Sequence, residues 1–218
     1  MSTTARPPDA AVPGDVVDLA TTLGPARAYV RRAPGDVGAL VLGHGAGGGV
    51  AAADLLAVTE AAHAAGWSVG LVEQPWRVAG RRVATPPASL DEAWRQIVPA
   101  LLDGALARSG RLVLGSRSAG ARVACRTAAA LGAAAALCLS FPLHPPGRPG
   151  RSRAQELEAG VPVLVVQGNR DPFGSPEEVV AAAPTGVSVV GVAGDHSLAR
   201  DVPAVVAAVR AWLADLRS

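Results

Sequence analysis

Several features are missing from this 218-residue sequence, and each absence excludes a class of function. All 20 basic residues are arginine, so the lysine that a Walker A phosphate-binding loop requires is absent. The formal net charge of +2 is too small to indicate binding to nucleic acid or to an anionic membrane. No apolar stretch approaches the ~18 uninterrupted residues of a membrane helix. We therefore expect neither nucleic acid nor a membrane as a partner.

Cysteine is almost absent too, and the N-terminus has no apolar segment. Cys125 and Cys138 fall in a helical pattern and a strand-like run, so both are expected to be small core residues and not a disulfide. Residues 1–14 are rich in proline and lack the apolar core of a signal peptide, so we interpret them as a flexible tail. Residues 15–218 have the length of one domain. We expect the protein to be cytoplasmic.

Apolar, β-branched runs alternate with helical patterns from residue 37 onward. Strands are expected at residues 37–42, 67–72, 111–115, 135–140, 161–167 and 187–192, and helices at 51–65, 89–108, 119–131, 152–159, 176–183 and 202–216. This alternation predicts an α/β fold, with a mostly parallel central sheet and helices on both faces.

Other segments do not follow this alternation. Two short strands at 16–20 and 26–32 are joined by a Gly-Pro turn and are expected to form an antiparallel hairpin. The proline-rich segments 73–88 and 141–150 are predicted to be loops, with Ser89 as the N-cap of the helix that follows the first of them.

Three polar residues each follow an apolar run, where an open α/β sheet presents side chains to a ligand. Ser118 lies in Ser-Arg-Ser-Ala-Gly, Asp171 in Asn-Arg-Asp-Pro-Phe-Gly and His196 in Gly-Asp-His-Ser. Nucleophile, acid and histidine in this order are typical of the α/β-hydrolase triad. A serine hydroxyl needs a neighbouring imidazole to take its proton, and a carboxylate fixes that imidazole's tautomer. We therefore predict that these three residues are catalytic.

Each triad residue also has a plainer interpretation. Ser118 would only cap the following helix, and Ser116 stands where the G-x-S-x-G turn usually has glycine. Asp171 would be a turn residue, and His196 a polar loop residue. Asp195 is the competing acid, but its position next to His196 in the sequence makes the far ring nitrogen hard to reach.

The glycine-rich segment 44–49 follows an earlier strand, where this fold places half of its oxyanion hole. We expect the hole to combine the backbone N–H of Ala119 with that of Ala46, with Gly47 as the alternative. Such donors face charge that develops only in the transition state.

The same loop has a competing interpretation. Gly43, Gly45 and Gly48 match the G-x-G-x-x-G dinucleotide fingerprint, and Glu73 ends the next strand, where a ribose-binding acid would lie. This fingerprint is weak alone, and it competes with a triad in the correct order.

Five segments together resemble the compact α/β-hydrolase-like family of bacterial hydrolases. They are His-Gly-Ala-Gly at 44–47, Glu-Gln-Pro-Trp-Arg-Val-Ala-Gly at 73–80, Phe-Pro-Leu-His-Pro-Pro-Gly at 141–147, Gln-Gly-Asn-Arg-Asp-Pro-Phe-Gly at 167–174 and Gly-Asp-His at 194–196. The family also includes a eukaryotic subunit of a histone-acetylation complex and its testis-expressed relative. It is broadly similar to dienelactone hydrolases.

The resemblance implies an α/β-hydrolase fold with a minimal lid and the triad Ser118, Asp171 and His196. It also implies Ala46 and Ala119 near the oxyanion. Family members often have methionine where this chain has Ala119, a difference that affects the width of the pocket.

Three further residues are candidates for substrate binding. His144 lies in the short segment where α/β hydrolases insert a lid, and it would either line the site or be structural. Trp76 and Arg77 lie in the predicted loop 73–88, where arginines would either attract an anionic substrate or form a solvated face. No two histidines have metal-ligand spacing on one element, so we expect no metal site and no cofactor.

Two hypotheses of different classes follow. The first is a serine hydrolase that acts on a small-molecule ester or thioester through an acyl-enzyme intermediate. The second is a non-catalytic α/β-hydrolase-fold module that binds a protein partner, because some relatives serve as scaffold subunits. No feature of the sequence predicts an oligomeric state.

Overall fold

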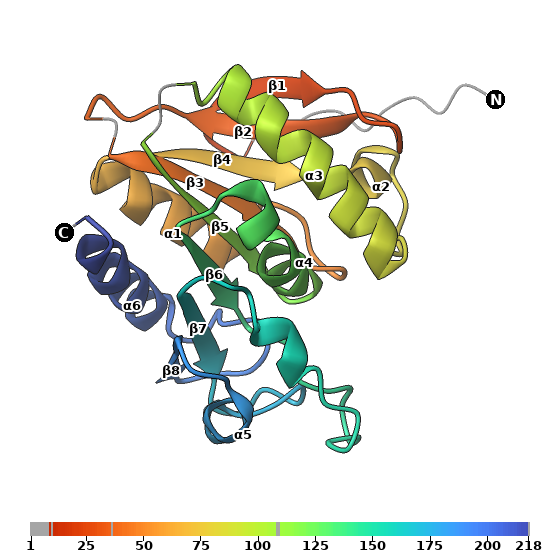
Figure 1. Cartoon of the computed structure of the whole chain (residues 1–218), viewed down its shortest axis with the longest axis vertical. Helices are drawn as coiled ribbons and strands as arrows, with labels where there is room; N and C mark the ends of the chain where they lie inside the picture. The colour runs from red at the N-terminus through yellow and green to blue at the C-terminus, as the bar shows by residue number, and fades with distance from the viewer. Residues whose placement is uncertain (1–8, 10, 36, 108–109, 218) are drawn as a thin grey trace.

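The computed structural model describes residue 9 and residues 11–35, 37–107 and 110–217. An eight-stranded sheet runs through the molecule in the order β1-β2-β4-β3-β5-β6-β7-β8 (Figure 1). Its strands are β1 (Asp15–Leu19), β2 (Ala26–Arg31), β3 (Gly38–Gly43), β4 (Trp67–Glu73), β5 (Arg111–Arg117), β6 (Ala135–Leu139), β7 (Val163–Gly168) and β8 (Val187–Val192). As predicted, β1 and β2 form an antiparallel hairpin; β2 is antiparallel to β4, and all later pairs are parallel.

The helices cover both faces of this sheet. They are α1 (Ala53–Ala64), α2 (Pro75–Val78), α3 (Pro87–Asp103), α4 (Ala119–Thr127), α5 (Pro176–Ala182) and α6 (Val202–Asp215). Figure 1 shows α3 and α4 on one face and α1 and α6 on the other. The predicted α/β architecture is therefore confirmed. Among the described helices, none is both long enough and apolar enough to cross a membrane.

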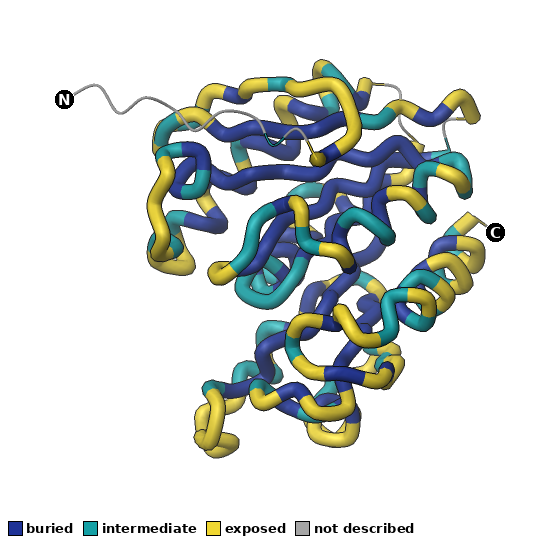
Figure 2. The backbone as a smooth tube through the Cα atoms, turned by 180° about the vertical axis from the view of Figure 1, so that it is seen from behind, coloured by how far each residue is buried: buried dark blue, intermediate teal, exposed yellow. Residues whose placement is uncertain are grey.

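The sheet separates two hydrophobic cores. Successive residues of a strand point to opposite faces, and in β3 Ala39 and Val41 enter the core under α3 and α4, whereas Leu40 and Leu42 enter the core under α1 and α6. All four are fully buried. The central strands are buried along their length, as the dark tube in Figure 2 shows. This burial explains why the strands read as continuous apolar runs.

The prediction of a loop over residues 73–88 was wrong in two places. Pro75 starts the one-turn helix α2, and Pro87 starts α3, so Ser89 is not the N-cap. Proline suits the first helical position because its missing N–H has no partner there in any helix. The carbonyl of Pro86, the residue at the N-cap, accepts the N–H groups of Ser89 and Leu90 instead. Pro75 and Pro87 therefore each begin a helix, although the abundance of proline in this segment predicts a loop.

The helix ends also differ from the expectation. α3 ends at Asp103 and not near residue 108, and residues 108–109 lie outside the described residues. α4 ends at Thr127, and a separate 3-10 turn follows at Ala129–Leu131. A second 3-10 turn, Ala154–Leu157, replaces the helix predicted over 152–159. These differences leave the order of the elements unchanged.

Part of the predicted N-terminal tail is in contact with the sheet. Val12 is buried in the core under α1 and α6. The backbone N–H of Asp9 donates to the Tyr29 hydroxyl of β2 over 2.6 Å. Residues 1–8 and 10 of the predicted tail lie outside the described residues, so the domain boundary stays a prediction.

The two cysteines lie where α4 packs on β6. Cys125 and Cys138 are both buried, as predicted, and their Sγ atoms are 3.3 Å apart without a disulfide bond. The hydrogen bond between the thiols and their burial raise the pKa of Cys138 well above its usual value. Both therefore act as small apolar core residues.

Candidate active site

Ser118 lies in a sharp turn between β5 and α4, at the C-terminal edge of the sheet. Its backbone has φ 54° and ψ −120°, a conformation that residues with a Cβ rarely adopt. The Ser118 N–H donates to the carbonyl of Leu139, at the end of β6, over 2.9 Å. The turn raises the serine side chain above the sheet, as a nucleophile elbow does.

The elbow depends on small residues around it. A Cβ added to Gly120 would lie 1.9 Å from Ser116 Oγ and 2.6 Å from the His44 carbonyl oxygen, so no larger residue fits there. Gly45 approaches from the glycine loop, and a Cβ there would lie 3.1 Å from Ser118 Cβ. Ser116, in place of the usual glycine, is buried, and its Oγ has no hydrogen-bond partner among the described residues. The turn therefore forms with serine at position 116.

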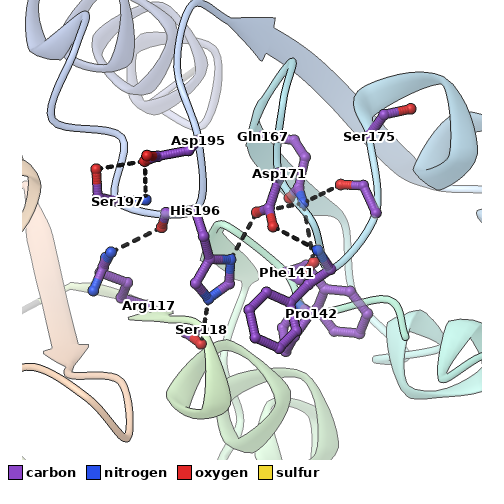
Figure 3. A network of polar contacts seen from close by, with 12 residues as sticks. Arg117, Ser118, Phe141, Pro142, Gln167, Asp171, Ser175, Asp195, His196 and Ser197 are labelled. Atoms are coloured by element: carbon purple, nitrogen blue, oxygen red, sulfur yellow. Dashed lines mark hydrogen bonds and ion pairs between the residues drawn. The ribbon is translucent and has the colours of Figure 1, made fainter. Parts of the chain in front are cut away.

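The structure brings Ser118, Asp171 and His196 into direct contact (Figure 3). His196 Nε2 lies 2.7 Å from Ser118 Oγ, and His196 Nδ1 lies 2.7 Å from Asp171 Oδ2. The serine follows β5, the aspartate follows β7 and the histidine follows β8. Parallel strands end at the same edge of a sheet, and this edge places the three side chains together.

The Asp171 carboxylate is fixed by two further hydrogen bonds. Its Oδ2 accepts from the buried Gln167 amide over 3.0 Å (Figure 3). Its Oδ1 accepts from the Phe173 N–H over 2.8 Å. The Asp171 side chain is fully buried. The Phe173 ring also packs on the His196 imidazole, with ring centroids 4.3 Å apart. The imidazole is thus held by the carboxylate and by a neighbouring ring.

Asp195, the competing acid, faces away from the imidazole. Its Oδ1 accepts from the Ser197 N–H over 2.9 Å and from the Ser197 hydroxyl over 2.6 Å. These hydrogen bonds hold the pKa of Asp195 below its usual value. Asp195 therefore stabilises the turn that carries His196.

The glycine loop after β3 is anchored by His44. Its Nδ1–H donates to the Gly45 carbonyl over 2.8 Å, and its Nε2 accepts the Gln74 N–H over 3.2 Å, which assigns the tautomer. Burial lowers the pKa of His44 to about 4, so the ring is neutral at physiological pH. Its edge also meets the ring of Trp76, with centroids 5.4 Å apart.

The residues predicted to form the oxyanion hole line one small cavity. Ala46 comes from the glycine loop and Ala119 from the start of α4, and both line this cavity. The competing dinucleotide interpretation requires an accessible Glu73. That carboxylate is buried and accepts a hydrogen bond from the Tyr29 hydroxyl over 3.3 Å, so it is not accessible to a ribose.

Arg117, to which the sequence assigned no role, connects three parts of the site. Its Nε forms an ion pair with Asp54 Oδ2 of α1 over 3.0 Å, and its Nη2 donates to the His196 carbonyl over 2.8 Å (Figure 3). The Asp54 side chain is 1% exposed, and burial raises its pKa even though Arg117 opposes the shift. Both partners are distant in sequence, so no local pattern indicated them.

The three predicted substrate-binding residues lie in different surroundings. His144 contacts the Glu178 carboxylate of α5 over 3.4 Å. Arg77 of α2 lies beside Gly49 of the glycine loop, and its buried Nε has no hydrogen-bond partner among the described residues. Trp76 lines the small cavity between the predicted oxyanion donors. Within the described part of the chain, no group of three or more His, Cys, Asp or Glu side chains is arranged to hold a metal ion.

Comparisons with known proteins agree with this fold. The model of a family described as an alpha/beta hydrolase domain matches residues 36–205. The fold is similar to an α/β serine hydrolase homologue from Coxiella burnetii, with a TM-score of 0.78, 15% identity and coverage of 93% of this chain and 98% of that one.

Two further structures are similar. An α/β serine hydrolase without a lid from Xanthomonas campestris has a TM-score of 0.71 and 18% identity over 94% of this chain and 95% of its own. An esterase domain from a Rhodothermus marinus protein has a TM-score of 0.68 and 13% identity over 93% and 97%. At these identities the likeness shows the fold alone. A comparison with curated proteins found no match.

The ion pair of Arg117 gives the first prediction. Arg117→Met leaves the Asp54 carboxylate buried without its counter-charge, so the free energy of unfolding should fall by about 3–5 kcal/mol. Urea unfolding at pH 7 measures this loss. Arg31→Met is the matched control, because Glu60, the ion-pair partner of Arg31, has an exposed side chain. The control should lose at most about 1 kcal/mol, and equal losses would contradict the structural role of Arg117.

The buried imidazole of His44 gives a second prediction, on the pH dependence of stability. Between pH 6.5 and 4 the unfolded chain protonates this histidine, whereas the folded chain, with a pKa of about 4, does not. The free energy of unfolding therefore falls as the pH falls through this window, by about 2 kcal/mol from this group between pH 7 and pH 5. Urea unfolding measures this effect. Between pH 7 and pH 5 the free energy of unfolding of His44→Gln should fall by about 2 kcal/mol less than that of the wild type. Identical losses in the variant and the wild type would show that His44 is not the group responsible.

Proposed function

Because the chain belongs to the alpha/beta hydrolase domain family, we propose that it is a serine hydrolase that acts on an ester or thioester of a small acyl compound. The observation that carries the proposal is the unbroken chain of contacts from Ser118 Oγ through His196 to Asp171, with 2.7 Å at each step. An imidazole at this distance accepts the serine proton, and a carboxylate on its other nitrogen stabilises the imidazolium that results.

The first half of the proposed reaction forms an acyl-enzyme. His196 Nε2 takes the proton from Ser118 Oγ as the oxygen attacks the carbonyl carbon of the substrate. The negative charge moves to the carbonyl oxygen, which the N–H groups of Ala46 and Ala119 stabilise. His196 then gives its proton to the leaving alcohol or thiol as the bond to the carbonyl carbon breaks.

The second half repeats these steps with water. His196 takes a proton from water, whose oxygen attacks the acyl carbonyl, and returns the proton to Ser118 Oγ as the acid leaves. Asp171 stays ionised throughout and holds the imidazole in the tautomer with the proton on Nδ1. The Gln167 and Phe173 hydrogen bonds support this role because they fix the carboxylate against the ring.

We also propose the cytoplasm as the location and Arg77 as a contact for an anionic substrate group. The alternative function is a non-catalytic module that binds a protein partner, based on the resemblance to the eukaryotic histone-acetylation-complex subunit. Such a module would not react with a fluorophosphonate probe, whereas a serine hydrolase would.

A fluorophosphonate probe tests the nucleophile. The probe should label the wild-type protein at Ser118 with one equivalent, detected by intact-protein and peptide mass spectrometry, and should not label Ser118→Ala. Ser197→Ala is the control, because its hydroxyl bonds to Asp195, and this variant should be labelled like the wild type. Absence of labelling in folded wild-type protein would overturn the proposal and favour the protein-binding module.

Replacing each candidate acid separately tests the role of Asp171. Asp171→Asn should lower kcat by a factor on the order of 10⁴ with the fold intact, because the imidazole then loses the carboxylate that sets its tautomer and stabilises its positive charge. Asp195→Asn should have a far smaller effect. Steady-state hydrolysis of an activated ester measures both variants, and the reverse ranking would assign the acid to Asp195.

A further inference from the structure

Two cavities meet at Trp76. The inner cavity lies beside the proposed catalytic serine and has a volume of about 10 Å³. The outer cavity, beyond α2, has a volume of about 360 Å³. Among the described residues that line them, Gln74 and Trp76 line both. Gln74 and Trp76 therefore form a wall shared by the two spaces.

An acyl group bound to Ser118 would lie against the inner cavity, because both proposed oxyanion donors line it. Ala46 and Ala119, the proposed oxyanion donors, line it together with Gly45, where an added Cβ would lie 3.1 Å from Ser118 Cβ. The rest of its lining is mostly apolar and includes Ala84, Leu90 and Val123. His44 also lines it and is neutral because of its lowered pKa. The surroundings suit an uncharged alkyl group.

The inner cavity is small. A cavity of about 10 Å³ is close to the smallest that holds one water molecule. Such a space admits at most a methyl group and not an extended chain. The outer cavity would take several more methylene groups, and its lining includes the apolar residues Leu23, Pro75 and Pro86.

Trp76 is held in place on several sides. Its side chain is buried, its ring meets the edge of the His44 ring, and its carbonyl accepts the Arg81 N–H over 3.0 Å. Pro75, directly before it, starts α2 and restricts the backbone. Gln74, the other wall residue, is tied to His44 through its N–H. An acyl chain would have to displace this packed group to pass from one cavity to the other.

We infer that Trp76 sets the length of the acyl group that this protein accepts, so that acetyl esters are its substrates and longer chains are rejected. The inference rests on the proposed function, because it assumes that Ser118 carries the acyl group. Removal of the indole should join the two cavities and allow longer chains to enter the outer one.

The test compares acyl chain lengths within each variant. We would measure kcat/KM for p-nitrophenyl acetate, butyrate, hexanoate and octanoate with the wild type, Trp76→Ala, Trp76→Phe and Leu23→Ala. The wild type should prefer acetate to hexanoate by at least tenfold, since a few methylene groups in a closed pocket have effects of this size. Trp76→Ala should raise the hexanoate-to-acetate ratio at least tenfold, and Trp76→Phe about threefold. Leu23→Ala changes only the outer cavity and should keep the wild-type ratio.

Because the readout is a ratio within one protein, a general loss of activity through the contact with His44 does not affect it. Circular dichroism and thermal unfolding would establish that each variant is folded, and Trp76→Phe provides the result if Trp76→Ala does not fold. A wild type that prefers hexanoate, or an unchanged ratio in both Trp76 variants, would overturn the inference and leave the serine hydrolase standing. Absence of ester hydrolysis together with absence of fluorophosphonate labelling would instead overturn the proposed function.

Discussion

The close approach of α4 to β5 at Ser118 is the constraint on which the rest of the site depends. The helix begins directly after the strand, and Gly120 leaves no space for a side chain between Ser116 and the His44 carbonyl. This contact joins the nucleophile turn to the glycine loop, since His44 belongs to that loop and is itself anchored to Gln74. The turn, the proposed oxyanion donors and the wall of the inner cavity are therefore parts of one packed unit.

The sequence predicted the elements whose signals are local. Apolar runs of five to seven residues in a parallel sheet are recognisable without their neighbours, because both faces of each strand are buried. The contact among Ser118, Asp171 and His196 could be predicted for a related reason. Once Ser118, Asp171 and His196 each follow a strand, parallel topology alone brings them to one edge. Asp171 was preferred to Asp195 because a residue next to His196 in the sequence cannot easily reach the far ring nitrogen. In the structure, Asp171 contacts the imidazole, whereas Asp195 accepts a hydrogen bond from Ser197.

Features that depend on contacts between distant segments could not be predicted. Arg117 is adjacent to Ser118, yet its partners come from α1 and from the loop after β8. The two cavities at Trp76 arise from α2, α3 and the glycine loop together. In the segment 73–88 the prolines predict a loop, although proline at the first position of a helix favours the helix. The pattern alone does not distinguish these two uses of proline.

The backbone of Ser118 has a consequence for how this fold balances stability against chemistry. Its positive φ costs on the order of 1–3 kcal/mol for a residue with a Cβ, and glycine would adopt the same turn with little strain. A sequence optimised for stability alone would therefore place glycine at position 118. The same positive φ recurs at Ser140, which directly follows β6, and at Leu198, so three described residues carry this cost. At position 118 the cost accompanies a hydroxyl that contacts His196.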